Sequence, residues 1–582
     1  MCGQARVAPP IATKFCVRSP RAISVFLCLF DEDQHETRLP MVRDGSNWVI
    51  TVAMAVGQRY GLRADGPPPF DFAKLLVDPN ATQLDRPFVS DPRLAVPGED
   101  TADLVPKALV TRPLPPLAFS PPVFRAGGLI YEVNVRGFTM RHPEVPLELR
   151  GTVAALAHPS VLAHLTKIGV DAVELMPVVA WLDERHLPPL GLSNAWGYNP
   201  VVPMALDPRL CPGGMAELRR TVDTLRTHGI GTILDLVLNH TAESDADGPT
   251  LSFRGLDDGV YARAPDGALI NDAGTGNTLD YGNPAVRDLA LTTLRHFVEE
   301  TGVDGFRFDL APILARAPGF DREAPIFAAI ADDPVLKDRI MIAEPWDTGP
   351  GGYQLGHFPP TWLEWNDRFR DDVRRFWRGD GSAGALATRL AGSTDVFGQE
   401  RTRSVNFVAA HDGFTLADSV SFADRRNHAN GEENRDGHAH EVSWSAKALG
   451  RDGRGDVRAM LASLFASRGT IMLTAGDEFG RSQRGNNNAY AQDNELSWLD
   501  WSGRDEELEA FVAALSQWRR PHAEIADPVV RHDLEWLALD GSKLRDGDWQ
   551  HADGFTMIVP GGASVRVDRG ARTVTLSPPP GA

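Results

Sequence analysis

Cysteine, membrane-spanning apolar runs and positive charge are all scarce in this chain, and each scarcity excludes a class of protein. Only four cysteines occur in 582 residues (Cys2, Cys16, Cys28 and Cys211), and no two have the close spacing of metal ligands. This excludes a disulfide framework and indicates a reducing compartment. The one candidate targeting segment, 22–30, is too short to span a bilayer and lacks a signal-peptide cleavage site. We therefore expect a cytoplasmic protein with no membrane partner.

The deficit of positive charge excludes a second class of partner. Lys and Arg together number 59 against 78 Asp and Glu, which gives a net charge of −19. Such a surface repels phosphate backbones, so no nucleic-acid partner is expected, whereas a neutral sugar polymer is indifferent to it. With 42% hydrophobic and 24% charged residues the composition is that of a globular protein, and its length predicts two to four domains.

Three parts can be distinguished along the chain by their hydrophobic periodicity. Short β-type runs separated by turns predict a β-sandwich over 1–115, followed by a stiff proline-dense linker at 112–122. Apolar strands alternating with amphipathic helices predict an α/β fold, a TIM (β/α)8 barrel, over 123–521, with an insertion at about 241–281. The final part, 522–582, predicts a small, shortened C-terminal β-domain.

Eight apolar segments are expected to form the barrel strands. They are 129–135, 172–176, 232–238, 305–309, 340–344, a weak one near 363–365, 404–409 and 470–474. Active sites of this fold lie at the C-terminal ends of the strands. Six polar side chains lie at or just past such ends, and we expect them to converge: Asp235, His240, Asp309, Glu344, His411 and Asp412.

Two of these carboxyl groups suit the two steps of retaining glycoside hydrolysis, which needs a nucleophilic carboxylate and a protonated carboxyl about 5–5.5 Å apart. Arg307 and Asp309 are two residues apart on one strand and face the same way, so the guanidinium favours the ionised nucleophile. Glu344 has no cation beside it in sequence and is expected to face other carboxylates, which suits the general acid. Asp412 would stabilise the transition state, and His411 and His240 would donate to sugar hydroxyls.

Each residue taken alone has a simpler structural interpretation. An Asp at a strand end is usually a solvated cap, an Arg-x-Asp pair is usually a surface ion pair, and a His-Asp pair is more often structural than catalytic. The four segments that carry these residues, taken together and in order, favour the catalytic interpretation. They are ILDLVLNHT at 233–241, GVDGFRFDL at 302–310, IMIAEPW at 340–346 and SVNFVAAHD at 404–412.

In this order the four segments resemble the signature blocks of the α-amylase superfamily, glycoside hydrolase family 13. The resemblance implies that Asp309 is the nucleophile, Glu344 the acid/base and Asp412 the stabiliser. Tyr198, in WGYNP at 196–200, is similar to the residue of that family that stacks on the sugar at the cleavage subsite. Trp346, next but one to Glu344, would shape the leaving-group side.

Further segments resemble a narrower group, the bacterial glycogen-debranching enzymes of the isoamylase type. They are YEVNVRGFTMRHP at 131–143, TGNTLD at 275–280, NGEENRDG at 430–437 and AGDEFGRSQRGNNNAY at 475–490. The N-terminal part is similar to a family 48 carbohydrate-binding module. The resemblance implies hydrolysis of α-1,6 branch linkages in glycogen and related branched α-glucans. No cofactor is expected.

Alternatives remain open at this point. The same carboxylates would serve an α-1,4-glucan hydrolase, a 4-α-glucanotransferase or a trehalose-releasing hydrolase, because loop shape sets the linkage. A glucan-binding scaffold with a dead site would be expected to have lost a carboxylate, and a metal-dependent barrel hydrolase would need His-rich strands. Asn239 and Asp280 offer oxygen ligands for Ca²⁺, but without further ligands the metal, like the oligomeric state, stays unassigned.

Overall fold

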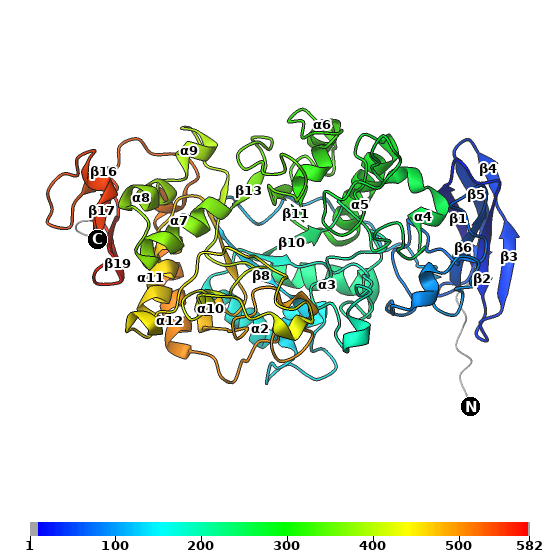
Figure 1. The fold of residues 1–582 in the computed structure, drawn as a ribbon, viewed down its shortest axis with the longest axis horizontal. Coiled ribbons are helices and arrows are strands. Elements are labelled where there is room, and N and C mark those ends of the chain that lie inside the picture. Colours follow the sequence, from blue (N-terminus) through cyan, green and yellow to red (C-terminus); the bar gives the residue numbers. More distant parts are fainter. Residues whose placement is uncertain (1–9, 580–582) are drawn as a thin grey trace.

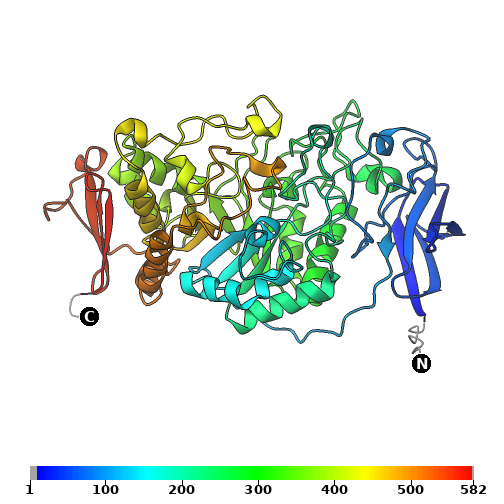
Figure 2. The same ribbon diagram turned by 90° about the horizontal axis from the view of Figure 1, so that it is seen from below.

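A closed eight-stranded barrel occupies the centre of the computed structural model, which describes residues 10–579 (Figure 1). Two small sheets lie at one end of the molecule and a single sheet lies at the other (Figures 1 and 2). Neighbouring barrel strands are parallel, in the order β10-β11-β12-β13-β14-β15-β8-β9, which confirms the predicted TIM barrel. The strands are β8 (Leu129–Val133), β9 (Ala172–Leu175), β10 (Gly231–Leu236), β11 (Gly305–Phe308), β12 (Ile340–Ala343), β13 (Leu363–Asn366), β14 (Ser404–Asn406) and β15 (Thr470–Thr474).

Helices follow the barrel strands, and their ends carry the expected signals. In α5 (Pro284–Thr301) the Asn283 side chain accepts from the Ala285 amide at the start, and Gly302 ends the helix with φ +74°. Within residues 10–579 every helix is too short or too polar to cross a lipid bilayer. The remaining helices are α1 (Val135–Thr139), α2 (Pro159–Ile168), α3 (Gly214–Thr227), α4 (Phe253–Leu256), α6 (Pro325–Asp332), α7 (Asp367–Arg378), α8 (Ala383–Leu390), α9 (Thr394–Phe397), α10 (Leu416–Ser419), α11 (Arg454–Phe465), α12 (Glu506–Arg519) and α13 (Ala523–Ala526).

The barrel interior changes from apolar to charged along the strands. A buried cluster near the strand starts takes one side chain from most strands: Ile130, Ala172, Ile233, Ile342, Leu363, Val405 and Met472. Because side chains alternate along a strand, the residues two positions later face the same interior. Several of these are charged and buried, namely Glu132, Glu174, Asp235, Arg307 and Glu344. The strands therefore deliver buried charge to the C-terminal mouth of the barrel.

The N-terminal sheets form a sandwich around one apolar core. One sheet has the order β1 (Ile11–Arg18), β5 (Asn47–Met54), β4 (Val42–Asp44), and the other has the order β3 (Glu36–Pro40), β2 (Ser24–Phe30), β6 (Arg59–Asp65), β7 (Ala108–Leu109). Phe15 and Val17 from the first sheet pack with Val25, Leu27 and Leu62 from the second. The expected N-terminal sandwich is confirmed.

This sandwich shares its core with loops of the barrel. Leu251 and Leu256, from the insertion after β10, belong to the same buried cluster as the sandwich residues. Polar contacts reinforce the junction, since the Ser19 hydroxyl donates to the carbonyl of Leu256 over 2.5 Å and Arg18 pairs with Asp257 at 2.9 Å. The sandwich is therefore packed directly against the insertion.

We expect Leu76→Ala to destabilise the protein by about 3 kcal/mol, because burying a leucine fills space that alanine leaves empty. Leu76 is 1% exposed, and its methyl groups fill the space beside Gly255 of α4, where an added Cβ would approach them to 2.5 Å. Chemical denaturation measures the loss. Leu147→Ala is the matched control, since Leu147 is 78% exposed and should change stability by less than about 0.5 kcal/mol. Equal stabilities of the two variants would contradict the shared core.

A single antiparallel sheet forms the C-terminal part. Its strands, in order, are β16 (Glu535–Leu537), β17 (Gly554–Ile558), β18 (Ser564–Asp568) and β19 (Thr573–Ser577). Phe555, Val565 and Val567 are fully buried and belong to the same cluster as the barrel helices. The expected small C-terminal β-domain is confirmed. It is a single sheet whose apolar face packs against the barrel helices.

Candidate active site

Arg307, on β11, lies at the centre of the charged layer and contacts three carboxyl groups. Its Nη1 donates to both oxygens of Asp235 at 2.9 Å and to Oδ1 of Asp309 at 3.1 Å, and its Nη2 lies 3.1 Å from Oε2 of Glu344. The register explains one of these contacts, because Asp235 and Arg307 are direct neighbours across β10 and β11. Sequence reasoning paired Arg307 with Asp309 alone and noted that Glu344 has no cation beside it in sequence. The parallel pairing of β11 with β12, in which Arg307 lies opposite Ile342, brings the guanidinium to Glu344 as well.

Asp309 follows β11 and receives a donor on each oxygen. Besides Arg307 on Oδ1, the side-chain amide of Asn239 donates to Oδ2 at 2.8 Å and to the Asp309 carbonyl at 2.8 Å. Both donors favour a carboxylate in a fixed orientation. The side chain keeps 12% exposure and lines the cavity at the barrel mouth, so one face is available to a ligand.

Glu344 follows β12 and is held as an acid by its surroundings. Burial raises the pKa of its carboxyl, and the nearby charges of Asp309 and Asp412 act in the same direction, against Arg307 and a backbone amide. That amide is Leu310 N–H, which donates to Oε2 at 2.7 Å. Leu310 has φ +43°, a strained left-handed conformation that is uncommon for leucine and that places its amide against the acid.

We expect the pH profile to reflect this environment. A general acid must be protonated, so kcat/KM should fall as pH rises through the raised pKa of Glu344. The alkaline limb should lie well above about pH 4.3, the ordinary value of a glutamic acid. Initial rates across pH on a soluble glucan measure it, with stability checked at each pH. A kcat/KM that already falls between about pH 4 and 5 would contradict the assignment.

Asp412 follows β14 and stays ionised although it is partly buried, with a side chain that is 26% exposed. Its Oδ2 accepts from His438 Nε2 at 2.9 Å. Burial works against the charge, but this hydrogen bond and the positive charges of His411 and Arg370 hold the pKa of Asp412 well below its usual range. Asp412 therefore presents a permanent negative charge to the cavity that it lines.

His411, beside Asp412, is a cation. Its Nδ1 lies 2.7 Å from Oε1 of Glu132, and despite burial this carboxylate raises the pKa of His411 to about 9. The His411 ring stacks on Tyr198 with 4.9 Å between ring centroids. The Tyr198 hydroxyl donates to Oδ2 of Asp235 at 2.5 Å, which fixes the aromatic face toward the cavity. Burial raises the pKa of Asp235 to about 6.

A cavity of about 770 Å³ opens above these groups. Of the nine side chains proposed from the sequence, Tyr198, His240, Asp309, His411 and Asp412 line it. Asp235, Arg307 and Glu344 are not among the lining residues, but Arg307 contacts both of the other two, and the Glu344 side chain keeps 8% exposure. Trp346 is half-buried against the barrel's apolar cluster and does not line this cavity.

His240 is engaged differently from the expectation. Its Nδ1 lies 2.5 Å from the Asn239 side-chain oxygen, and its Nε2 lies 3.0 Å from the Tyr198 carbonyl. Both ring nitrogens thus face protein acceptors, and burial lowers the pKa of His240.

Asn239, considered above as a Ca²⁺ ligand, has its side-chain amide bonded to Asp309 and its side-chain oxygen beside His240. Among residues 10–579 no three His, Cys, Asp or Glu side chains are grouped so that they could hold a metal ion.

Sequence reasoning missed several residues of the site. Glu132 and Glu174 are buried neighbours across β8 and β9, and burial raises the pKa of Glu174 well above its usual range. Trp196 and Tyr490 line the cavity. A carboxyl inside an otherwise apolar strand, as in AVEL at β9, was a signal that could have located Glu174.

Comparisons with known proteins agree with this geometry. Residues 5–81 match the model of carbohydrate-binding module 48, the isoamylase N-terminal domain. The glycogen debranching enzyme of Serratia proteamaculans is 44% identical over 93% of this chain and 87% of its own length, and that of Cronobacter sakazakii is 44% identical over 93% and 89%. The chain belongs to the glycogen debranching enzyme family. The expectation of a glycoside hydrolase of the α-amylase superfamily is thereby confirmed.

Solved structures agree on the fold. Pullulanase from Anoxybacillus sp. LM18-11 superposes with a TM-score of 0.71 over 95% of this chain and 77% of that chain, at 24% identity. Its complex with maltotetraose gives 0.71 over 99% and 85%, at 23% identity. At these sequence identities, the similarity shows that this member of the debranching-enzyme family shares its fold with pullulanase.

Proposed function

We propose that this protein hydrolyses α-1,6 branch linkages in glycogen or its limit dextrin by a retaining double displacement. The observation that carries the mechanism is the Arg307 guanidinium, which contacts both Asp309 and Glu344 at 3.1 Å. One guanidinium touching both groups favours the short spacing of a retaining pair, about 5–5.5 Å, over the wider spacing of an inverting pair. Family membership supports the branch linkage and glycogen.

In the first step the Asp309 carboxylate attacks C1 of the branch glucose. The C1–O6 bond breaks, and the Glu344 carboxylic acid gives its proton to the departing O6 of the main chain. The product is a glycosyl ester on Asp309. In the second step Glu344, now a carboxylate, takes a proton from water while the water oxygen attacks C1. The ester bond breaks, Asp309 is released as a carboxylate, and the free chain keeps the α configuration.

The remaining groups stabilise the charge that develops on the sugar. Asp412 is ionised, so its carboxylate accepts from two sugar hydroxyls and stabilises the oxocarbenium-like transition state. His411 is a cation and donates to a sugar oxygen. The Tyr198 ring offers an apolar face to the C–H face of the pyranose. Arg307 and Asp235 position the reacting carboxyls.

The domain assignment follows from the same proposal. We assign 1–115 to a glucan-binding sandwich, 123–521 to the catalytic barrel and 522–582 to a supporting sheet. A cytoplasmic location accords with the three cysteines that the structure describes, Cys16, Cys28 and Cys211, which are free thiols, whereas Cys2 lies outside the described residues.

A singly branched maltooligosaccharide of known structure tests linkage and stereochemistry together. Proton NMR during hydrolysis should show loss of the α-1,6 anomeric signal and, before mutarotation, a new reducing end in the α form. A β reducing end would exclude the retaining mechanism. Loss of the α-1,4 signals would favour the α-1,4 hydrolase or 4-α-glucanotransferase instead.

A further inference from the structure

The Asp412 carboxylate is held by a side chain from a separate loop. His438 lies on the loop 420–453, between α10 and α11, and its Nε2 is 2.9 Å from Oδ2 of Asp412. Its side chain is 49% exposed and is not part of the cavity lining. Oδ2 of Asp412 is engaged in this way, whereas Asp412 itself lines the cavity.

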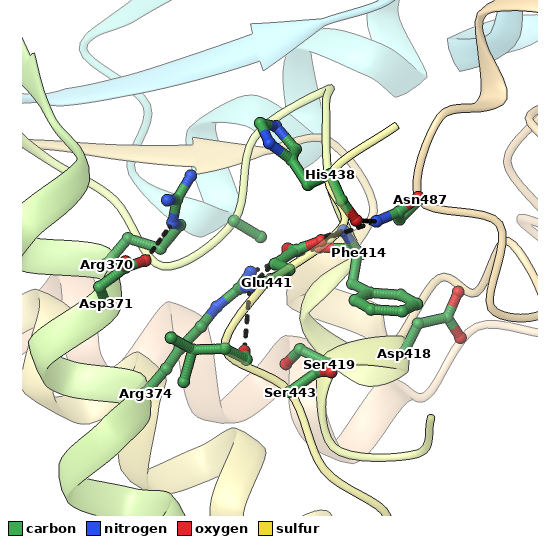
Figure 3. A network of polar contacts seen from close by, with 12 residues as sticks. Arg370, Asp371, Arg374, Phe414, Asp418, Ser419, His438, Glu441, Ser443 and Asn487 are labelled. Carbon is green, nitrogen blue, oxygen red and sulfur yellow. Dashed lines mark hydrogen bonds and ion pairs between the residues drawn. The ribbon is translucent and has the colours of Figure 1, made fainter. Parts of the chain in front are cut away.

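A buried ion pair anchors the loop three residues further on. Glu441 Oε1 accepts from Arg374 Nη1, on α7, at 2.6 Å, and their side chains are 4% and 1% exposed (Figure 3). The Phe414 amide donates to both oxygens of Glu441, at 2.9 and 3.0 Å. Glu441 therefore ties the His438 loop to the backbone immediately after Asp412.

Arg374 also contacts the segment before Asp412 in the chain. Its Nε donates to the Val408 carbonyl at 2.8 Å, four residues before Asp412. Gly413 makes the close approach possible, since an added Cβ there would lie 2.6 Å from Glu441 Oε1 and its φ is +81°. Arg374 and Glu441 thus bracket the Asp412 segment on both sides.

Asn487 completes the connection between the two loops. Its carbonyl accepts from the Gly413 amide at 3.0 Å, and its side-chain amide donates to the His438 carbonyl at 3.0 Å and to Glu441 Oε2 at 3.2 Å (Figure 3). Asn487 thus links Gly413, the residue after Asp412, to His438 and Glu441.

We propose that His438 is a positioning residue of the reaction, which fixes the orientation of the Asp412 carboxylate, and that the Arg374–Glu441 pair holds His438 in register with it. The inference rests on the proposed function only in assigning Asp412 to the transition state. A partly buried carboxylate with one fixed oxygen is preorganised, so it need not reorient as charge develops on the sugar.

The charges around His438 favour its protonated form. Asp412 and Glu441 raise its pKa above the usual value for histidine, against burial and the positive charge of Arg370 on α7. The imidazolium therefore persists to higher pH than that of an isolated histidine, and the charge-assisted bond is lost gradually as pH rises through this raised pKa. Neutral imidazole still donates from Nε2, so the alkaline change is partial.

The test compares three single variants of the full chain. His438→Ala should lower kcat about tenfold and change KM by less than about threefold. A tenfold loss is the low end for removing a hydrogen bond to a charged group, which is expected because His438 is half-exposed. His438→Gln places an amide donor near the Nε2 position, so it should recover most of kcat and lack the alkaline change attributable to His438. His440→Ala, an exposed histidine of the same loop, is the matched control and should behave as wild type.

Glu441→Gln tests the anchor, because it keeps an acceptor for the Phe414 amide and removes the charge opposite Arg374. It should lower both Tm and the kcat of the folded enzyme. Wild-type kcat in His438→Ala at every pH would overturn the proposal, and wild-type kcat in folded Glu441→Gln would overturn the anchoring part. If the wild type cleaves only linear α-1,4 glucans, the proposed function fails, yet the same variants still test His438 on that substrate.

Discussion

Asp309→Asn should lower kcat by a factor of about 10⁴ or more while the protein stays folded. Asparagine has the shape of the carboxylate but cannot form the glycosyl ester. The fold is expected to survive because Arg307 keeps two carboxyl partners, Asp235 and Glu344. Single-turnover rates on a branched glucan measure the loss, and thermal unfolding and glucan binding show that structure and affinity persist.

Asp266→Asn provides the matched control for this substitution. Asp266 is an exposed carboxylate on the insertion that accepts from the nearby Ala268 amide, so its loss should leave kcat unchanged. Asp309→Asn that retains more than about 1% of the wild-type rate, with deamidation excluded by mass spectrometry, would contradict the nucleophile assignment.

Glu344→Gln should lower kcat on natural glucans by about 10³-fold, because O6 of a sugar is a poor leaving group without a proton donor. An aryl or fluoride leaving group departs unaided, so the first step should survive on an activated α-glucoside. The second step then lacks its base, and azide, which needs none, should restore turnover. The product should be an α-glucosyl azide, because azide attacks the glycosyl ester on Asp309 from the α face.

The stereochemistry of rescue separates the two carboxyl groups. Asp309→Ala leaves room for azide on the nucleophile's side, so any rescued product should be the inverted β-glucosyl azide. A β product from Glu344→Gln, or an α product from Asp309→Ala, would show that the two roles are exchanged. Absence of both rescue and an initial burst in Glu344→Gln would contradict its acid/base role.

Much of the barrel follows from local patterns in the chain. Each predicted strand overlaps an observed one, and even the weak segment near 363–365 forms β13. Apolar runs that end in a charged residue mark both the strand and its functional end, so Asp309, Glu344 and Asp412 could be proposed from sequence. The placement of Asp309 and Glu344 around the Arg307 guanidinium could not, because it depends on the register between neighbouring strands.

The contacts that tune the site join residues far apart in the chain. His411 meets Glu132 across 279 positions, and no local pattern reports such a pair. His438 lies in a loop without strand or helix periodicity, so its contact with Asp412 had no sequence signal. The left-handed Leu310 is a similar case, since leucine gives no hint of a positive φ. Trp346 shows the converse, because its proximity to Glu344 in sequence does not bring it into the cavity lining.

Incubation with phosphorylase-limit glycogen, and separately with linear maltooligosaccharides, tests the central claim most directly. Chromatography resolves the released chains, and Asp309→Asn serves as the blank. Release of short linear chains from the branched substrate alone is the result expected of an α-1,6 debranching hydrolase. Redistribution of chain lengths from the linear substrate, with no release from limit glycogen, would contradict it and identify a glucanotransferase or amylase.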